Sequence, residues 1–220
     1  MVIMGIDPGL ANTGWGIVET RGPVCRARAY GCISTPASEQ LDRRLGRIYA
    51  EISDAIQAYQ PSQLAIEKIF FGENSRSAIA TAHARGAAIV ACARAGLEVG
   101  EYTPMQIKQA VVGTGSADKR QVIFMVRTIL SLDHDPRPDH CADALAAAVC
   151  HANLTTTQRV ARNVASVAVF EAEQAQRDQA RKRASEETAA ATAAAVALRS
   201  AGPQARPAVS RSRQSRRSTQ

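Results

Sequence analysis

The sequence predicts an α/β fold in which helices flank a five-stranded mixed sheet. Five short apolar segments are separated by Gly, Pro and helical stretches, at residues 1–8, 13–20, 29–35, 64–67 and 97–102. The first three follow one another closely, as in an antiparallel meander. A helical stretch separates the third segment from the fourth, and such a connection makes a strand parallel to its neighbour in the sheet. We therefore expect a mixed sheet.

The helices are expected from apolar spacing and from their boundaries. Residues 41–59 carry apolar side chains at helical spacing, and Pro61 closes this segment. Residues 74–95 form an unusually Ala-rich helix, whose small side chains suit a buried helix or a subunit interface. The remaining helical segments begin at Pro104 and span residues 119–130 and 139–154.

The composition divides the chain into residues 1–154 and residues 155–220. The first part carries equal numbers of basic and acidic side chains, so the formal net charge of +7 belongs to the second. Residues 171–199 are rich in Ala, Glu, Gln and Arg and have high helix propensity, whereas residues 200–220 are expected to be disordered. We therefore predict one folded domain followed by an extension that is partly helical and then disordered.

The cysteines and the apolar runs bear on the cellular compartment. The five cysteines form no CxxC pair, which indicates reduced thiols. No basic segment followed by an apolar run opens the chain, and no apolar run reaches the roughly 18 residues of a membrane span. We therefore expect a soluble, cytoplasmic protein that does not enter a membrane.

Two acidic residues end apolar strands. Asp7 follows a buried run and precedes the turn residues Pro8-Gly9, and Glu67 ends the strand at 64–67. If these strands are neighbours, both carboxylates emerge at one sheet edge, where open α/β sheets place ligand sites. Each residue also has a plainer interpretation, because Asp before Pro-Gly is commonly a turn residue and Glu at a strand end is commonly solvated.

The start of the last helix adds further candidates. Asp139 and Asp143 are four residues apart, and His140 and Asp143 are three apart, so either pair shares a helix face. Asp139 follows Pro138 and is also a natural N-cap. The spacing alone leaves both pairs open.

Acidic residues gathered at one sheet edge suit a two-metal hydrolytic site. Phosphodiester cleavage needs a hydroxide nucleophile and stabilisation of the leaving oxygen, and two Mg²⁺ ions about 4 Å apart supply both. Such hard cations prefer carboxylate oxygens. A zinc site is the weaker alternative, because neighbouring side chains seldom reach one ion. Its candidate ligands would be His134, His140, Cys141, Cys150 and His151.

Several motifs together resemble the RuvC family of Holliday-junction resolvases, which are crossover junction endodeoxyribonucleases with an RNase H-like fold. In chain order the motifs are GIDPG (5–9), TGWG (13–16), AIEKIFFGEN (65–74), ARGAAIVA (84–91), QIKQAVVGTGSADKRQV (106–122) and HCADALAAAVCH (140–151). A GIDPG-like start alone occurs across RNase H-like proteins, whereas the ordered set is specific. The resemblance covers the chain up to about residue 153.

The resemblance implies a homodimer that places paired nicks in four-way DNA junctions during recombination and repair. It implies Mg²⁺ as cofactor, two ions per active site, with Mn²⁺ as a substitute, and a branch-migration complex of the RuvA and RuvB proteins as partner. Asp7, Glu67 and Asp143 match the family's metal-binding acids. The fourth position is Asp in many members and is His140 here, which we expect to be the ligand, with Asp139 as the alternative.

Four further residues are expected to act on DNA. Lys108 and Lys119 match lysines of the family motifs, and an ammonium near the cleaved phosphate stabilises its negative charge. Arg120 is expected to contact DNA beside Lys119. Phe70 matches the family's aromatic position, where a ring either stacks on an unpaired base or closes the core.

Other functions are less consistent with the sequence. An actin-like ATPase shares the Gly-Ile-Asp start but needs a duplicated domain, for which residues 1–154 have no room. A non-catalytic DNA-binding protein would not need Asp7, Glu67 and Asp143 together. An RNA-cleaving nuclease of the same fold is disfavoured by the motifs after residue 84.

The Arg-rich segment 206–217 is either an arm that binds DNA phosphates or a solubilising extension.

Overall fold

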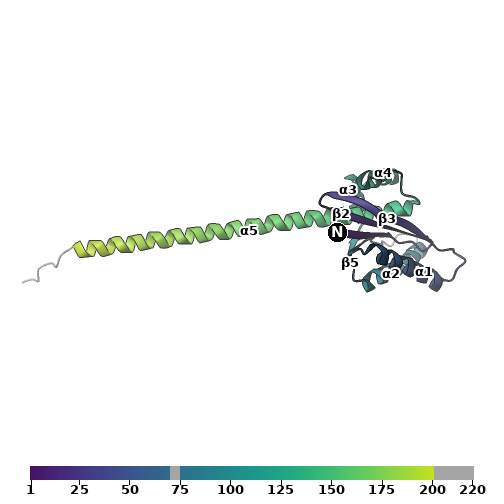
Figure 1. Ribbon diagram of the computed structural model, residues 1–220, viewed down its shortest axis with the longest axis horizontal. Helices are drawn as coiled ribbons and strands as arrows, with labels where there is room; N and C mark the ends of the chain where they lie inside the picture. Colours follow the sequence, from purple (N-terminus) through teal and green to yellow (C-terminus); the bar gives the residue numbers. More distant parts are fainter. Residues whose placement is uncertain (70–74, 201–220) are drawn as a thin grey trace, which may run out of the picture. The chain divides into compact units, whose positions relative to one another are not determined.

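One mixed sheet forms the centre of the protein, whose computed structural model describes residues 1–69 and 75–200. The strand order is β3-β2-β1-β4-β5 (Figure 1). The pairs β1–β2 and β2–β3 are antiparallel, whereas β1–β4 and β4–β5 are parallel, which confirms the predicted mixed sheet. The strands span Val2–Asp7 (β1), Asn12–Arg21 (β2), Val24–Ser34 (β3), Gln63–Glu67 (β4) and Glu98–Tyr102 (β5).

The third strand is longer than predicted. It begins well before residue 29, because Gly22 adopts a left-handed conformation (φ 60°) and lets β2 turn directly into β3. Cys25 is buried, whereas Arg26 and Arg28 are exposed. A half-exposed strand at the edge of a sheet carries few apolar residues, and the search for apolar runs missed its first part for that reason.

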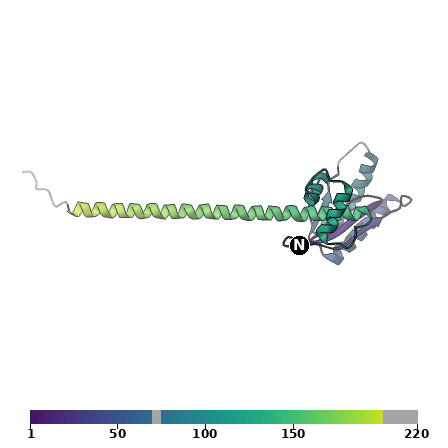
Figure 2. The same ribbon diagram turned by 90° about the horizontal axis from the view of Figure 1, so that it is seen from above.

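The helices α1 (Leu41–Tyr59) and α2 (Ser75–Arg94) cover one face of the sheet (Figures 1 and 2). Both were predicted, and α1 has the predicted bounds. Met4 and Ile6 of β1 point into this layer, because successive strand residues face opposite sides of a sheet. The buried side chains of α1 recur at helical spacing and pack against them, at Ile48, Ile52, Ala55 and Ile56.

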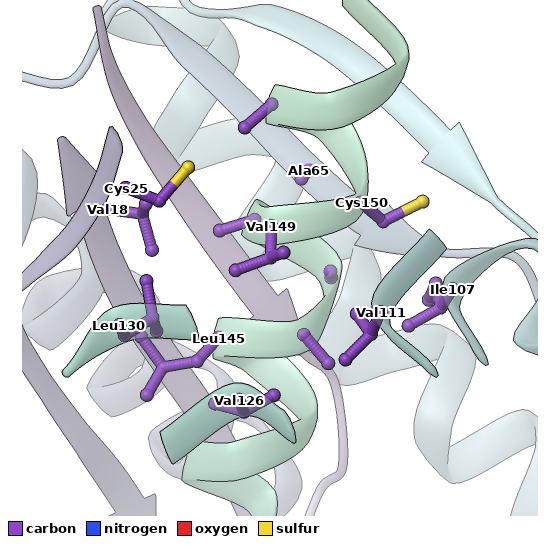
Figure 3. Packing of buried hydrophobic residues seen from close by; sticks show 14 of the residues in the cluster. Val18, Cys25, Ala65, Ile107, Val111, Val126, Leu130, Leu145, Val149 and Cys150 are labelled. Atoms are coloured by element: carbon purple, nitrogen blue, oxygen red, sulfur yellow. The ribbon is translucent and has the colours of Figure 1, made fainter. Parts of the chain in front are cut away.

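The other face is covered by α3 (Pro104–Val112), α4 (Lys119–Leu130) and the first turns of α5 (Asp139–Ser200). Figure 3 shows this cluster, to which Leu145 of α5 and Leu130 of α4 contribute. From the sheet, Ile3 and Ala65 point into it. By the same alternation, the ends of β1 and β4 direct Asp7 and Glu67 toward the face that α5 covers.

The helix α5 approaches β1 and β2 more closely than a side chain on the sheet would allow. An ideal Cβ atom on Gly5 would lie 1.9 Å from the carbonyl oxygen of Ala144, and one on Gly14 would lie 2.0 Å from that of His140. Gly16, which pairs with Gly5, would place its Cβ atom 2.6 Å from Leu145. The glycines of the GIDPG and TGWG motifs therefore determine how close α5 lies to the strands.

A buried histidine joins α5 to β4 and β5. His151 is 4% exposed, and its Nδ1 atom lies 2.7 Å from the hydroxyl of Tyr102. Its Nε2 atom lies 2.8 Å from Oε1 of Gln63. Burial lowers the pKa of His151, and the neutral ring accepts from Tyr102 and donates to Gln63, so both nitrogens have partners.

The helix α5 continues to Ser200, and the chain divides into two compact units after Ala161. The sequence composition places this boundary at residue 154, within the same helix. In the second unit, residues 174–183 of the helix are exposed. The Arg-rich segment 206–217 lies outside the described residues. Across the described chain, no helix combines the length and the apolar character that crossing a membrane requires.

The close contact between α5 and the sheet predicts that Gly14→Ala is destabilising. Its Cβ atom would meet the backbone of His140, so we expect the free energy of unfolding to fall by about 1–3 kcal/mol, as for other overpacked sites. Gly46→Ala is the control, because nothing lies within 4 Å of its Cβ position in α1. There a gain of about 0.4–1 kcal/mol is expected. Urea denaturation measures both, and equal effects would contradict the close contact.

Candidate active site

Two neighbouring parallel strands bring Asp7 and Glu67 to the same edge of the sheet. Ile6 of β1 pairs with Ile66 of β4, and each acid is the next residue and the last of its strand. Both side chains are partly buried. The predicted placement of these two acids at adjacent strand ends is therefore confirmed.

The first turn of α5 adds His140 and Asp143 to this edge. His140 Nδ1 lies 2.7 Å from Oδ2 of Asp7, although the two residues are 133 positions apart in the sequence. One ligand atom from each of Asp7, His140 and Asp143 lies within 4.8 Å of the other two. The spacing of three residues, rather than that of four, is the one that faces Asp7.

Asp139 does not join this cluster. It is exposed and is the first residue of α5, inside the helix, so the prediction that it is the N-cap is wrong. An acidic side chain in the first turn still interacts favourably with the partial positive charge of the helix N-terminus. Of the two alternatives that the spacing left open, His140 therefore faces Asp7 and Asp139 does not.

Glu67 lies beside the cluster of Asp7, His140 and Asp143 and is not one of its members. It lines a pocket of about 140 Å³ together with Lys108, Lys119 and Asp143. Lys119 forms an ion pair with Oδ2 of Asp143. Asp143 therefore belongs to both groups, between the Asp7–His140 pair on one side and the lysine-lined pocket on the other.

Lys108 and Lys119 lie on α3 and α4, two short helices whose first turns are fixed by capping boxes. At Thr103 and at Asp118, a capping box fixes the first turn of α3 and of α4, because the cap side chain and the third helical residue each satisfy a free backbone N–H. Lys119 and Arg120 are the first two residues of α4 and are exposed. Lys108 lies on α3 and is half-buried.

Crowding shifts the pKa values of the acids. Burial raises the pKa of Asp7, opposed by its hydrogen bond to His140, and the charge of Asp143 raises it further. Burial, followed by the charges of Asp7 and Asp143, raises the pKa of Glu67 to about 7, while Lys119 and Lys108 lower it. Between pH 4.5 and about 7, the native chain therefore keeps a proton on Glu67 that an unfolded chain has already released. Because the native state binds more protons in this range, the free energy of unfolding falls as the pH rises from 4.5 to about 7.

Such a group of donors could hold a divalent cation. Two carboxylates and one imidazole converge within 4.8 Å, and a bound cation would relieve the repulsion between the carboxylates of Asp7 and Asp143. The donor set fits Mg²⁺ or Mn²⁺ better than zinc, since no cysteine takes part in it. Of the other residues considered for zinc, His134 faces Tyr30 and His151 is bonded to Tyr102 and Gln63.

Two contributions to the site were not found in the sequence. Arg85 of α2 donates from Nε to the main-chain carbonyl of Glu67, at 3.4 Å, and forms an ion pair with Glu101. The sequence shows only an Arg within an Ala-rich helix, which gives no local sign of these partners. Gly14 was noted only within a motif, although its missing side chain allows the approach of His140. Phe70, the predicted base-stacking residue, lies outside the described residues.

A mixed sheet with this strand order and with acids at the ends of its two central parallel strands is the architecture of the RNase H-like nucleases. Within that class, the family model described as "Crossover junction endodeoxyribonuclease RuvC" matches residues 3–151. The chain therefore belongs to the RuvC family of crossover junction endodeoxyribonucleases, as its motifs predicted.

Individual relatives agree with this assignment. The crossover junction endodeoxyribonuclease RuvC of Moorella thermoacetica is 50% identical over 165 residues, which cover 75% of this chain and 99% of the relative. The enzyme of the same name from Desulforamulus reducens is 48% identical, over 71% of this chain and 96% of the relative. The structure of Thermus thermophilus RuvC in complex with a Holliday junction substrate is similar with a TM-score of 0.69 and 40% identity. That match covers 72% of this chain and 96% of the other.

The charges around Glu67 predict how its titration responds to substitution. In the metal-free protein, Asp143→Asn should lower the pKa of Glu67 from about 7, because it removes a neighbouring negative charge. Lys119→Met should raise that pKa, because it removes a positive charge. The ¹³C chemical shift of the Glu67 carboxyl, followed from pH 4 to pH 9, measures both changes. Shifts in the same direction in the two variants would contradict the arrangement.

Proposed function

We propose that this protein resolves four-way (Holliday) DNA junctions by paired metal-dependent nicks, in homologous recombination and DNA repair. The observation that carries the proposal is the convergence of Asp7, His140 and Asp143, with Glu67 at the next strand end. A non-catalytic DNA-binding protein has no need of acids held together against their repulsion. The relative from Thermus thermophilus, 40% identical, binds a Holliday junction substrate.

In the proposed mechanism, Asp7, Glu67, His140 and Asp143 would hold two divalent cations, Mg²⁺ or Mn²⁺. When bound, these cations supply an activated water and stabilise the leaving oxygen of the phosphodiester. The carboxylates orient the site and must be ionised to do so. In the metal-free protein the pKa of Glu67 is raised to about 7, chiefly by burial, so a cation must displace a proton there, and cleavage at limiting metal should increase as the pH rises through that value.

The lysine-lined pocket is the proposed binding site of the scissile phosphate. Lys108 and Lys119 line it together with Glu67 and Asp143, so an anion there meets two ammonium groups beside the cation ligands. Positive charge at this point stabilises the extra negative charge of the transition state. Arg120 is exposed next to Lys119, and we propose that it binds a flanking phosphate. The products would be nicks with 5′-phosphate and 3′-hydroxyl ends, which can be religated.

A homodimer provides the second active site that paired nicks require. The exposed face of α2 carries Ile79, Ala82, Gly86 and Val90, at helical spacing, and Ile79 and Val90 are 53% and 51% exposed. Nothing lies within 4 Å of the Cβ position of Gly86, so a second backbone can approach there. A twofold contact of α2 with its copy would bury this face. The further partners that we propose are the RuvA and RuvB proteins of the branch-migration complex, acting on bacterial DNA in the cytoplasm.

The first test is cleavage of a synthetic mobile four-way junction in Mg²⁺, beside a linear duplex of the same sequence. We expect paired nicks in the junction alone. Asp7→Asn should lower the cleavage rate at least about 100-fold, the rate equivalent of the several kcal/mol that bound metal contributes, while junction binding persists. His140→Ala should also lose cleavage, and full activity of that variant would exclude it as a ligand. Tight junction binding by the unmodified protein, without cutting in Mg²⁺ or Mn²⁺, would argue for a scaffold.

The proposed dimer contact is tested separately. The double variant Ile79→Glu, Val90→Glu places charges on the exposed face of α2 and should convert dimers to monomers at micromolar concentration, as measured by light scattering. Coincident nicks should then become single nicks. Ala58→Glu, on an exposed position of α1, is the control and should leave the dimer intact. A dimer that survives the double variant would place the interface elsewhere.

A further inference from the structure

The segment that follows Asp7 is held by two buried threonines. The carbonyl of Gly9 accepts a hydrogen bond from the hydroxyl of Thr13 at 2.7 Å, and that of Leu10 accepts one from the hydroxyl of Thr35. The backbone N–H of Thr35 donates to the carbonyl of Ala11 at 2.9 Å. Three consecutive carbonyls are thus bound from the protein side, and the threonines are 0% and 3% exposed.

Arg44 of α1 binds Thr35, one of these two threonines. Its Nε atom donates to the hydroxyl oxygen of Thr35 at 2.8 Å, and a second guanidinium nitrogen donates to the Thr35 carbonyl at 3.2 Å. The Thr35 hydroxyl has one hydrogen, and because it accepts from Arg44 it directs that hydrogen to Leu10. The chain of bonds from Arg44 through Thr35 to Leu10 is therefore directional, and each bond strengthens the next.

Arg44 and the candidate active site lie on opposite sides of the sheet. Asp7 is hydrogen-bonded to His140 of α5. Arg44 lies on α1, which packs on the opposite face of the sheet. Its influence on Asp7 therefore runs through the backbone of the segment 8–11.

We propose that Arg44 is a positioning residue of the nuclease site, which acts through Thr35 to fix the segment that follows Asp7 and thereby the Asp7 carboxylate. This inference rests on the proposed function, because it assigns Asp7 to the metal site. Without the bond from Arg44, the Thr35 hydroxyl can rotate away from Leu10, and the strand end that carries Asp7 gains freedom. Ligands held loosely bind metal weakly, since outer partners of metal ligands typically contribute 10- to 100-fold in affinity.

The matched variants are Arg44→Met and Arg47→Met. Arg47 lies one turn further along α1, is exposed, and pairs with Glu39 on the surface at 3.3 Å. Both substitutions remove one positive charge from the same helix, and only the first removes the contact to Thr35. In a second pair, Thr35→Val removes the hydroxyl and Thr35→Ser keeps it. This pair tests the same contact if Arg44→Met does not fold.

Three readouts follow the proposal. Amide hydrogen exchange of residues 9–13 in the metal-free protein should be about tenfold faster in Arg44→Met and Thr35→Val, and unchanged in Arg47→Met and Thr35→Ser. Mn²⁺ binding without DNA, measured by electron paramagnetic resonance, should weaken about tenfold in the same two variants. Junction cleavage should fall at limiting metal and recover at high metal, because the ligands themselves remain.

The outcomes separate this inference from the proposed function. If Asp7→Asn abolishes Mn²⁺ binding and cleavage, but Arg44→Met behaves as Arg47→Met does, the positioning role of Arg44 is wrong and the metal site stands. If Arg44→Met loosens the segment 8–13 while Mn²⁺ affinity is unchanged, Arg44 stabilises the loop only, and the proposal is again wrong. If Asp7→Asn leaves metal binding and cleavage intact, the proposed site itself fails.

Discussion

The close approach of α5 to β1 and β2 is the constraint on which the rest of the site depends. The glycines at positions 5, 14 and 16 remove the side chains that would otherwise hold this helix away from the sheet. Only at that distance does the first turn of α5 bring His140 within hydrogen-bonding distance of Asp7. The same contact explains why the start of α5 is rich in alanine, since larger side chains at Ala144 or Ala148 would meet β1. The packing of α5 on the sheet and the assembly of the candidate site thus depend on the same contacts.

Acids crowded in this way destabilise the folded protein unless a positive charge lies nearby. Such a charge can come from the protein itself or from a bound cation. Within the protein, Lys119 pairs with Asp143 and His140 bonds to Asp7, so the site is tolerable without metal. From outside, a cation would provide a stronger compensation. Burial, together with the charges of Asp7 and Asp143, still raises the pKa of Glu67 to about 7 despite Lys119 and Lys108, at the point where the proposed metal and phosphate sites meet.

Much of this arrangement could be predicted from the sequence, for identifiable reasons. The position of Glu67 beside Asp7 follows from a strand–helix–strand connection, because such connections are parallel and nearly always right-handed. The bounds of α1 follow from its apolar spacing. The spacing from Asp143 permits both Asp139 and His140, and only the family resemblance favoured His140, because the rotation of α5 on the sheet decides which of them faces Asp7. That rotation depends on the contact between Gly14 and the backbone of His140, and local sequence patterns give no information about contacts between distant residues.

Other features depend on contacts between distant parts of the chain and were missed for that reason. The bonds of Arg44 to Thr35, and of Arg85 to the carbonyl of Glu67, join elements whose mutual placement is known only from the folded protein. An Arg on the surface of a helix gives no local sign of such a partner. The start of β3 was missed because its exposed arginines interrupt the apolar pattern of an edge strand.

The distance of 133 positions between Asp7 and His140 has a consequence during synthesis. The ribosome completes the sheet strands before the first turn of α5, so a growing chain carries Asp7 and Glu67 for a long interval without the other half of the site. The candidate site is complete only when the whole domain has emerged and α5 has docked. A nascent or truncated chain without α5 therefore lacks His140 and Asp143, which are two of the three residues in the acidic cluster.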